Sequence, residues 1–336
     1  MKILLLCRYS QLGASSRVRF LQYLPFIESK GWSVDVSPLF ADRYLHALYR
    51  KRSLVTAVID GYWRRLREII LAKQYDLIWI EKEVFPYLPV LLERVLVNAG
   101  IATIVDYDDA WFHRYDRHHS RLVRLMLGDK IDAVMRHSTL VVAGNEYLAN
   151  RAKIAGAKWV EIIPTAIDLQ RYQIVPSTTN RKTLIGWIGS PATSHYLKTI
   201  TPVIESLAKN NNLKVIALGA DKMTLESLPI EIWRWSEETE VQCLRSFDIG
   251  VMPLIDSAWE RGKCGYKLIQ YMACGKPVVA SPVGVNKDIV EHGVNGFLAA
   301  STDQWHNALI TLSENPELRK KMGAAGREKV RKEYSI

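Results

Sequence analysis

The chain has 336 residues, which is too long for one ordinary core and long enough for two domains. Its apolar fraction of 48% and charged fraction of 24% are typical of a folded globular protein and exclude disordered, collagen-like and coiled-coil classes. Lysine and arginine exceed aspartate and glutamate by 45 − 35 = 10, so we expect an anionic partner: nucleic acid, a membrane surface or a phosphorylated small molecule.

The cysteines and the first residues indicate the compartment. Cys7, Cys243, Cys264 and Cys274 form no C-x-x-C pair, which favours reduced thiols in a cytosolic protein over disulfides or a zinc site. The opening MKILLLC is followed directly by Arg8, so we interpret it as a buried strand and not as a signal peptide. No apolar run approaches the ~20 residues that cross a membrane. We therefore expect a cytoplasmic protein that is at most peripheral to a membrane.

The first half of the chain alternates short apolar runs with helical patterns. Strands are predicted at residues 3–7, 33–36, 76–80, 102–105, 140–143 and 160–163, and helices at 17–30, 86–98, 121–137 and 145–154. This alternation is typical of parallel β-α-β units and predicts a doubly wound sheet. Residues 164–181 contain two prolines and no periodicity, which predicts a linker.

The second half repeats the pattern. Strands are predicted at residues 184–188, 213–218, 249–252, 277–280 and 296–298, and helices at 194–208, 265–274, 304–313 and 317–333. The predicted fold class is therefore α/β, with two Rossmann-like domains over residues 1–172 and 173–336. Ligands of such sheets bind beyond the carboxyl ends of the strands, so the loops there are the places to search.

Residues 262–275, GKCGYKLIQYMACG, carry the most information. At 100° per residue, one helix face is apolar and the opposite face holds Lys267, Gln270, Tyr271 and Cys274. Glycines before the helix allow close backbone approach, and the helix start favours phosphate. An amphipathic helix with two solvated lysines is the competing interpretation. The residues proposed to meet the phosphate are Lys263, Gly265 and Lys267.

The surroundings of this helix favour the phosphate interpretation. YMACGKPVVASPVGV at 271–285 and EHGVNGFLA at 291–299 resemble the retaining family-4, or group 1, glycosyltransferases of the GT-B fold. GASSRVR at 13–19, AGNEYL at 143–148 and IPTAID at 163–168 extend the resemblance over most of the chain. The resemblance implies a GT-B fold whose two Rossmann-like domains face a central cleft. Residues 1–172 would form the acceptor side and residues 173–336 the nucleotide-sugar donor side.

The resemblance also implies donor-binding positions, from which this chain departs. Two family glutamates, for the donor sugar and the ribose, correspond to Gly262 and Gln270. Gln270 can still hydrogen-bond a ribose hydroxyl, whereas Gly262 cannot, and Glu260 is a weaker substitute. The family's phosphate-binding arginine and lysine correspond to Ser190 and Tyr196. We therefore expect Lys263 and Lys267 to supply the missing charge.

Two further segments match ligand-binding regions of the family. Trp235, or its neighbour Arg234, would stack on the nucleotide base, although a tryptophan beside a strand is more often part of a core. Gly13 permits close approach of backbone N–H groups after the first strand. Arg17 or Arg19 would then face an anionic group on the acceptor or phosphate side.

VDYDDAW at 105–111 follows a strand and supplies the catalytic candidates, Asp108 and Asp109. They fall where the family commonly has a His-Asp pair near the donor sugar. Capping of a following helix is an equally good interpretation. Asp106 and Asp108 also have the D-x-D spacing of the metal motif in the GT-A fold. Because GT-B enzymes usually need no such ion, we expect neither a metal nor a cofactor.

These observations predict a retaining glycosyltransferase that moves a sugar from a nucleotide diphosphate sugar to a carbohydrate or lipid-linked acceptor, such as a cell-surface polysaccharide precursor. The alternative is a GT-B module that binds nucleotide sugars or regulates without catalysing transfer, which the altered positions favour. An epimerase on the same fold is a further possibility. Nucleic acid is not an expected partner, because no reading motif accompanies the basic residues.

The positive charge is concentrated in the predicted acceptor domain. Residues 1–172 hold 25 basic and 18 acidic side chains, a balance of +7, and the remainder hold 20 and 17, a balance of +3. Basic and aromatic residues mix at 43–67 and at 113–124, as suits an anionic membrane surface, although a solvated helix face is the simpler interpretation. Family members commonly continue past a segment like Tyr334–Ile336, so a truncated C-terminus is one interpretation of this chain.

Overall fold

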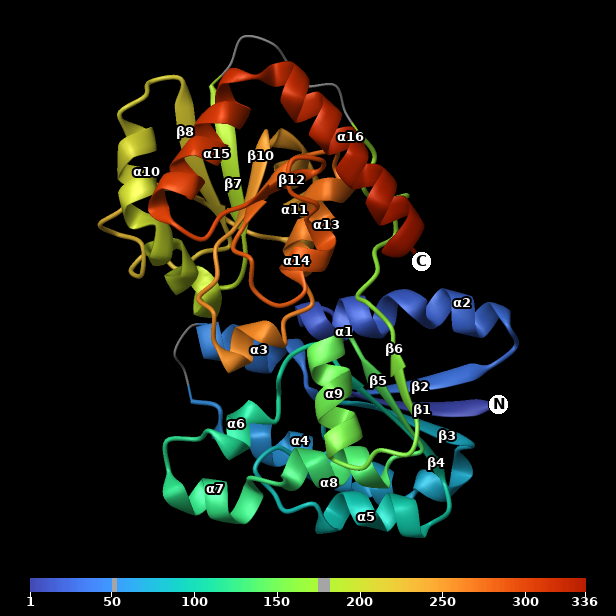
Figure 1. The fold of residues 1–336 in the computed structure, drawn as a ribbon. Helices are drawn as coiled ribbons and strands as arrows, with labels where there is room; N and C mark the ends of the chain where they lie inside the picture. The colour runs from blue at the N-terminus through green and yellow to red at the C-terminus, as the bar shows by residue number, and fades with distance from the viewer. Residues whose placement is uncertain (50–52, 175–181) are drawn as a thin grey trace. The chain divides into compact units, whose positions relative to one another are not determined.

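The computed structural model describes residues 1–49, 53–174 and 182–336. These residues pack into two compact units (Figure 1). Unit 1 comprises Met1–Thr165 together with Gly262–Cys264, and unit 2 comprises Ala166–Arg261 and Gly265–Ile336. Within the described residues, no helix has the length and apolar character needed to cross a membrane. Residues 50–52 of the first basic stretch and 175–181 of the predicted linker lie outside the described residues.

The sheet of unit 1 has six parallel strands in the order β2-β1-β3-β4-β5-β6. The predicted succession of parallel strands is therefore confirmed for this half of the chain. The strands extend beyond the predicted runs mainly at their carboxyl ends, where polar residues still pair with the neighbouring strand. Their bounds are β1 (Lys2–Tyr9), β2 (Ser33–Phe40), β3 (Leu77–Glu81), β4 (Ala102–Tyr107), β5 (Leu140–Ala143) and β6 (Val160–Ile162).

The helices of unit 1 cover both faces of this sheet, with α1 and α2 along one face and α4, α5 and α8 along the other (Figure 1). Their bounds are α1 (Ala14–Arg19), η1 (Leu21–Tyr23), α2 (Leu24–Ser29), α3 (Asp42–Tyr49), α4 (Val55–Ile70), η2 (Ala72–Gln74), α5 (Leu91–Asn98), α6 (His113–Asp116), α7 (Arg121–Leu127), α8 (Lys130–His137) and α9 (Glu146–Ile154).

Three predicted helices of unit 1 were wrong in extent. The helix predicted at 17–30 is interrupted after Arg19, and α2 starts anew with Pro25 in its first turn. The one at 86–98 begins only at Leu91, because two prolines precede it. The one at 121–137 is two helices, because the backbone leaves helical geometry at Asp129 (φ −94°, ψ 5°).

Unit 2 repeats the architecture with a six-stranded parallel sheet in the order β12-β11-β10-β7-β8-β9. The sequence missed the short strand β9 and the helix α11. The bounds of its elements are β7 (Thr183–Ile188), η3 (Pro191–Ile200), α10 (Thr201–Ala208), β8 (Leu213–Leu218), β9 (Glu231–Trp233), α11 (Glu237–Ser246), β10 (Ile249–Met252), α12 (Ala258–Arg261), α13 (Tyr266–Ala273), β11 (Val278–Ala280), α14 (Asn286–Ile289), β12 (Gly296–Leu298), α15 (Thr302–Glu314) and α16 (Pro316–Glu333).

Both faces of the unit 2 sheet are buried, each under its own layer of helices. Trp187 of β7 packs in the cluster that contains α10 and α15, whereas the next residue, Ile188, packs in the cluster that contains α13. Side chains of a strand alternate between its two faces, so these two clusters are the two sides of one sheet. This arrangement explains why the strands read as continuous apolar runs.

Arg65 of α4 is the anchor between helix and sheet in unit 1. Its guanidinium is only 1% exposed and donates hydrogen bonds to the carbonyl oxygens of Cys7 (2.8 Å), Ser37 (2.9 Å) and Val84 (3.3 Å). Burial lowers the pKa of Arg65 to about 10. Counting Arg65 with the solvated basic face of residues 43–67 was therefore wrong: the side chain joins β1, β2 and the segment after β3.

We predict that Arg65→Met lowers the free energy of unfolding by at least about 3 kcal/mol, because three buried carbonyl groups each lose a donor. Urea denaturation measures the loss. The matched control is Arg67→Met on the same helix, where the side chain is exposed and the change should stay within about 0.5 kcal/mol. Equal losses for the two variants would contradict the anchoring role.

Candidate functional site

The carboxyl ends of β3 and β4 bring a cluster of charged side chains together in unit 1. Glu81 ends β3 and is followed by Lys82 and Glu83, while Asp106 in β4 is followed by Asp108 and Asp109. The two strands are hydrogen-bonded neighbours with Glu81 opposite Asp106, so their carboxyl ends lie at the same edge of the sheet. This is the edge at which parallel sheets bind ligands.

Asp108 is paired with Lys82. The Lys82 Nζ lies 2.8 Å from the Asp108 Oδ1, and the two side chains are 5% and 12% exposed. Burial alone would raise the pKa of Asp108, but the charge of Lys82, the Ser15 hydroxyl and the charge of Arg19 together hold that pKa below its ordinary value. Asp108 is therefore an ionised carboxylate.

Asp109 is the more accessible carboxyl of the pair, with 26% of its side chain exposed. Its Oδ1 lies 3.7 Å from the Lys263 Nζ, and its Oδ2 lies 4.0 Å from the Lys82 Nζ. Burial raises the pKa of Asp109, the charge of Asp108 adds to the rise, and Lys263 opposes it. Two adjacent carboxyls whose pKa values are pushed apart are typical of acid–base sites.

Lys263 reaches Asp109 because residues 262–264 pack as part of unit 1. The Asn145 side-chain amide caps α9 and donates to the carbonyl oxygens of Gly262 (3.0 Å) and Lys263 (3.2 Å). A Cβ added to Gly262 would lie 2.5 Å from the Ala110 Cβ. No side chain fits at position 262 unless the backbone moves.

Asp106 forms a two-pronged ion pair with Arg19, at 2.9 Å to Oδ1 and 3.0 Å to Oδ2. Burial raises the pKa of Asp106 to about 6, and Arg19 limits the rise. The remaining Arg19 nitrogen donates to the Ile163 carbonyl oxygen (2.8 Å) and the Thr165 hydroxyl (3.4 Å). Both carboxylates of the D-x-D spacing are thus paired with cations of the chain itself.

Glu83 organises the aromatic side chains beside this cluster. It accepts hydrogen bonds from the Trp111 indole (2.6 Å), the Tyr115 hydroxyl (2.8 Å) and Lys130 (2.7 Å). The cationic groups of Arg8, Arg114 and Lys82 lie 4.5, 4.7 and 5.0 Å from the centre of the Trp111 ring. Three cations against one indole hold the ring firmly through cation–π contacts.

The other residues proposed for unit 1 lie in and before α1. Gly13 is the N-cap residue before that helix, and a Cβ there would come within 2.4 Å of the Tyr9 Cβ, so only glycine fits. Its N–H donates to the Ser10 carbonyl oxygen. Arg17 is 5% exposed and donates to the Gln11 carbonyl oxygen at 3.0 Å. Arg17 and Arg19 are therefore both buried within unit 1.

In unit 2, α13 starts at a left-handed glycine. Gly265 has φ 64° and ψ 17°, a conformation that favours glycine. The Lys267 Nζ in the first turn lies 4.1 Å from the centre of the Trp187 ring. The predicted polar face was wrong for Gln270, Tyr271 and Cys274, which are all buried, because α13 is covered on that side as well.

Gln270 belongs to a buried polar group in unit 2. Its amide nitrogen donates to the Glu240 carboxylate (2.9 Å) and to the Tyr172 hydroxyl (3.2 Å). The Trp235 indole donates to the other Glu240 oxygen at 2.6 Å. Trp235 and Gln270, both predicted to bind the nucleotide-sugar donor, therefore contact the same carboxylate. That carboxylate, Glu240, was not among the predicted site residues.

Glu260, Ser190 and Tyr196, which the sequence analysis also singled out, lie in unit 2. Glu260 is 5% exposed and accepts hydrogen bonds from the hydroxyls of Tyr196 and Ser257. Ser190 precedes η3, and its carbonyl oxygen accepts from the Thr193 N–H at 2.9 Å. The carboxylate of Glu260 is thus held by two hydroxyl groups of unit 2.

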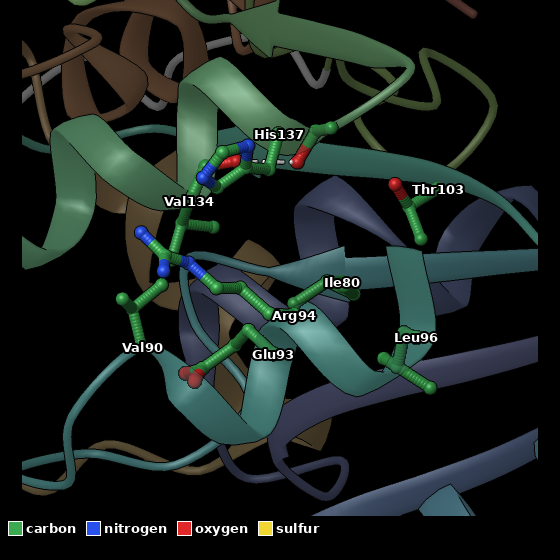
Figure 2. A pocket seen from close by; sticks show the side chains of 9 residues that line it. Ile80, Val90, Glu93, Arg94, Leu96, Thr103, Val134 and His137 are labelled. Atoms are coloured by element: carbon green, nitrogen blue, oxygen red, sulfur yellow. Dashed lines mark hydrogen bonds between the residues drawn. The ribbon is translucent and has the colours of Figure 1, made fainter. Parts of the chain in front are cut away.

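Figure 2 shows a small hollow between α5, α8 and the strands β3 and β4 of unit 1. None of the predicted site residues lines it. The Glu93 Oε2 and the His137 Nε2 have no hydrogen-bond partner among the described residues. The residues that line the hollow are Ile80, Val90, Glu93, Arg94, Leu96, Thr103, Val134, His137 and Ser138.

Sequence reasoning missed Lys82, Glu83 and Glu240. A signal existed for the first two, because the run Glu81-Lys82-Glu83 directly follows the apolar residues of β3. Three charged residues at the carboxyl end of a buried strand indicate a site by the same reasoning that singled out Asp108. Glu240 gave no such signal, since it lies among other acidic residues in α11.

Residues 182–315 match the family model described as "Glycosyl transferases group 1". A stretch of 72 residues is 35% identical to trehalose synthase of Pyrococcus horikoshii, which is 21% of this chain and 17% of that protein. The chain spans about a fifth of the length of the curated relatives that it matches. The family match includes the predicted residues from Ser190 to Gln270.

Several solved structures resemble the whole chain. Anabaena HepE, in complex with UDP and glucose, has a TM-score of 0.72 and 17% identity, covering 100% of this chain and 96% of that one. Sucrose-phosphate synthase of Thermosynechococcus elongatus has a TM-score of 0.71 and 13% identity, covering 100% and 95%. At this identity the likeness concerns the fold, and the predicted GT-B fold of two Rossmann-like domains is confirmed.

We predict that Arg19→Met destabilises the protein more at pH 8 than at pH 5. The folded-state pKa of Asp106 is raised to about 6, so the stability due to its protonated form is lost as the pH rises through that value. Without Arg19 the ionised carboxylate is buried unpaired at pH 8, at a cost of about 3 to 5 kcal/mol, whereas at pH 5 the group is protonated. Urea denaturation at both pH values measures the difference.

The matched control for this prediction is the double variant Arg19→Met with Asp106→Asn, in which no carboxyl is left to titrate. Measured against Asp106→Asn alone, its loss of stability should be the same at pH 5 and pH 8. If Arg19→Met loses the same amount of stability at pH 5 and pH 8, the pairing of Arg19 with Asp106 is contradicted.

Proposed function

We propose that this protein is a retaining glycosyltransferase that moves a sugar from a nucleotide diphosphate sugar to an acceptor. The observation that carries the proposal is the match of residues 182–315 to group 1 glycosyl transferases. The matched residues include the glycine-led start of α13, where backbone N–H groups and the helix dipole favour a phosphate.

The donor binds through α13 and the polar group beside it. The left-handed Gly265 lets the diphosphate approach the backbone, and Lys263 and Lys267 supply positive charge in place of a metal ion. Gln270 is buried and its amide nitrogen already donates to Glu240 and Tyr172, so it meets the ribose only when this polar group opens. HepE, which shares the fold, was solved with UDP and with UDP-glucose, so these are the first ligands to test.

The carboxylates of unit 1 act on the transferred sugar. When the diphosphate leaves, negative charge grows on its oxygens and positive charge grows on the sugar carbon. Lysines and backbone N–H groups stabilise the first charge, and ionised Asp108 stabilises the second. Asp109, with its raised pKa and greater exposure, is suited to meet the acceptor hydroxyl.

The acceptor is carried at an anionic membrane surface, as a lipid-linked or cell-surface polysaccharide precursor would be. The support is the surface of α7, where Leu122, Leu125 and Met126 are 64%, 82% and 63% exposed. Arg117, Arg121 and Arg124 are exposed beside them, and residues 117–128 contain no acidic residue. Exposed apolar and basic side chains on one short helix and in the segment before it suit the interface of an anionic bilayer.

We predict that Lys263→Ala with Lys267→Ala weakens the binding of UDP-glucose by at least about tenfold, because each lysine contributes a charge-assisted contact to the diphosphate. Isothermal titration calorimetry measures the affinity. Lys209→Ala is the matched control, an exposed lysine beyond the end of α10 that should leave the affinity unchanged. Unchanged affinity in the double variant would overturn the assignment of the phosphate site.

The same samples distinguish an enzyme from a non-catalytic binding module. An enzyme releases UDP from UDP-glucose when a suitable acceptor is present, and the anomeric configuration of the product shows whether it is retained. Binding of UDP-glucose with no release over a panel of acceptors would favour the binding module.

We predict that Leu125→Ser with Met126→Ser reduces binding to vesicles of phosphatidylglycerol and phosphatidylcholine by at least about tenfold, because two exposed apolar side chains no longer enter the bilayer. Co-sedimentation at low salt measures the binding. Met223→Ser in unit 2, where the side chain is 75% exposed, is the control. Equal binding by the unaltered protein, the double variant and Met223→Ser would exclude α7 as the membrane-binding element.

A further inference from the structure

Lys82 has an unusual backbone conformation for a lysine. Among the described residues, Lys82 (φ 66°) and Tyr87 (φ 59°) are the non-glycine residues with positive φ. Side chains with a Cβ avoid this left-handed region because the Cβ crowds the carbonyl oxygen. Strained backbone of this kind persists where the surrounding structure enforces it, and it is concentrated at functional sites.

Hydrogen bonds on both sides hold the strained residue in place. The Lys82 N–H donates to the Asp106 carbonyl oxygen at 3.1 Å, and the Glu83 N–H donates to the Glu81 carbonyl oxygen at 2.7 Å. The turn sends three consecutive charged side chains to different partners. Glu81 accepts from the Arg8 N–H and the Ser16 hydroxyl, while Glu83 accepts from Trp111, Tyr115 and Lys130.

The Lys82 ammonium is surrounded by the carboxylates of the candidate site. It lies 2.8 Å from Asp108, 4.0 Å from both Asp109 and Glu81, and 5.0 Å from the centre of the Trp111 ring. The residue is 4% exposed, so the ammonium has little contact with water. A buried cation is stable only when it is paired, and Asp108 is the partner at hydrogen-bond distance.

Lys82 makes the surroundings of the two aspartates different, because it lies close to Asp108 and farther from Asp109. Asp108 is faced by Lys82, the Ser15 hydroxyl, Arg19, Asp109, Asp106 and the Cys264 thiol. Asp109 is faced by Lys263, Asp108 and, at greater distance, Lys82. Asp108 therefore has its partner at 2.8 Å, whereas both lysines near Asp109 lie at 3.7 Å or beyond.

We propose that Lys82 is a positioning residue of the proposed transfer reaction: it fixes Asp108 as a permanent negative charge and leaves Asp109 as the carboxyl that meets the substrate. This role rests on the proposed function for its catalytic part, but the charge of Asp108 can be measured without any activity. The strained turn is then explained, because it places the ammonium of Lys82 between the two carboxyls.

Lys130 is a buried, paired lysine of the same unit whose role is structural, and it is the comparison for Lys82. It is 3% exposed, donates to Glu83 and lies 3.5 Å from Glu93, yet it sits in the ordinary helical backbone of α8. No contact of Lys130 with Asp108 or Asp109 is present among the described residues. Lys130→Met therefore removes a buried, paired lysine without touching the aspartate pair.

The test is a titration of aspartate side-chain carbons by 13C NMR in the full chain, with Asp108→Asn and Asp109→Asn used to assign the two signals. Lys82→Met and Lys82→Gly should raise the midpoint of Asp108 by about 1 to 3 pH units, because the ion pair is lost. Lys82→Gly relieves the strained backbone, so it keeps the test valid if Lys82→Met fails to fold. Lys82→Arg should keep the midpoint low, and Lys130→Met should not change it.

An unchanged Asp108 midpoint in a folded Lys82 variant, or an equal rise in Lys130→Met, would overturn the proposal. The second measurement is the pH profile of kcat with UDP-glucose. Its acidic limb should move to higher pH in Lys82→Met, with KM unchanged and with recovery in Lys82→Arg. If the Asp108 midpoint shifts in Lys82→Met but the pH profile of kcat does not, the positioning role is also overturned. If the unaltered protein releases no UDP, the proposed function fails, while the titration still decides whether Lys82 sets the charge of Asp108.

Discussion

A charge buried in a protein is stable only when an opposite charge or several hydrogen-bond donors surround it. At the carboxyl edge of the unit 1 sheet this constraint decides where the side chains go. Asp106 is held by Arg19, Asp108 by Lys82 and Glu83 by Lys130. Because each pair joins a strand end to another element, the same contacts fix the loops after β3 and β4. Asp109, with the greatest exposure and the longest ion-pair distances, is the member of this network that is least constrained.

In unit 2 the corresponding constraint is the close packing of aromatic rings against glycines of the sheet. Gly250 packs against the ring of Tyr271, where an added Cβ would come within 2.3 Å, and Gly186 packs against Phe247 at 2.0 Å. These close approaches let aromatic rings fill the layer between the sheet and α13. The Tyr271 hydroxyl accepts a hydrogen bond from the Ile188 N–H at 2.8 Å, so the helix that carries the proposed donor residues is tied to β7. The position of α13 is thus set by packing, before any ligand binds.

Much of the fold could be predicted, because continuous apolar runs between turn residues mark buried parallel strands. Leu140–Ala143, Leu213–Leu218, Ile249–Met252 and Gly296–Leu298 have the predicted bounds. The partners of charged residues could not be predicted, since Arg19 and Asp106 are 87 positions apart. Helical periodicity likewise identified the apolar face of α13 but gave no sign that Gln270 is covered by Tyr172 and Glu240. The site residues proposed from the sequence remain predictions.

The packing of Gly262–Cys264 within unit 1 has a consequence for how the chain can be divided. The backbone passes from unit 1 to unit 2 after Thr165, returns for three residues at Gly262 and leaves again after Cys264. A fragment ending at Thr165 would lack the carbonyl groups that Asn145 binds and the cation nearest the Asp109 Oδ1. The two units are therefore interwoven in sequence: a circular permutation or a domain exchange at residue 165 alone would separate unit 1 from part of its own structure.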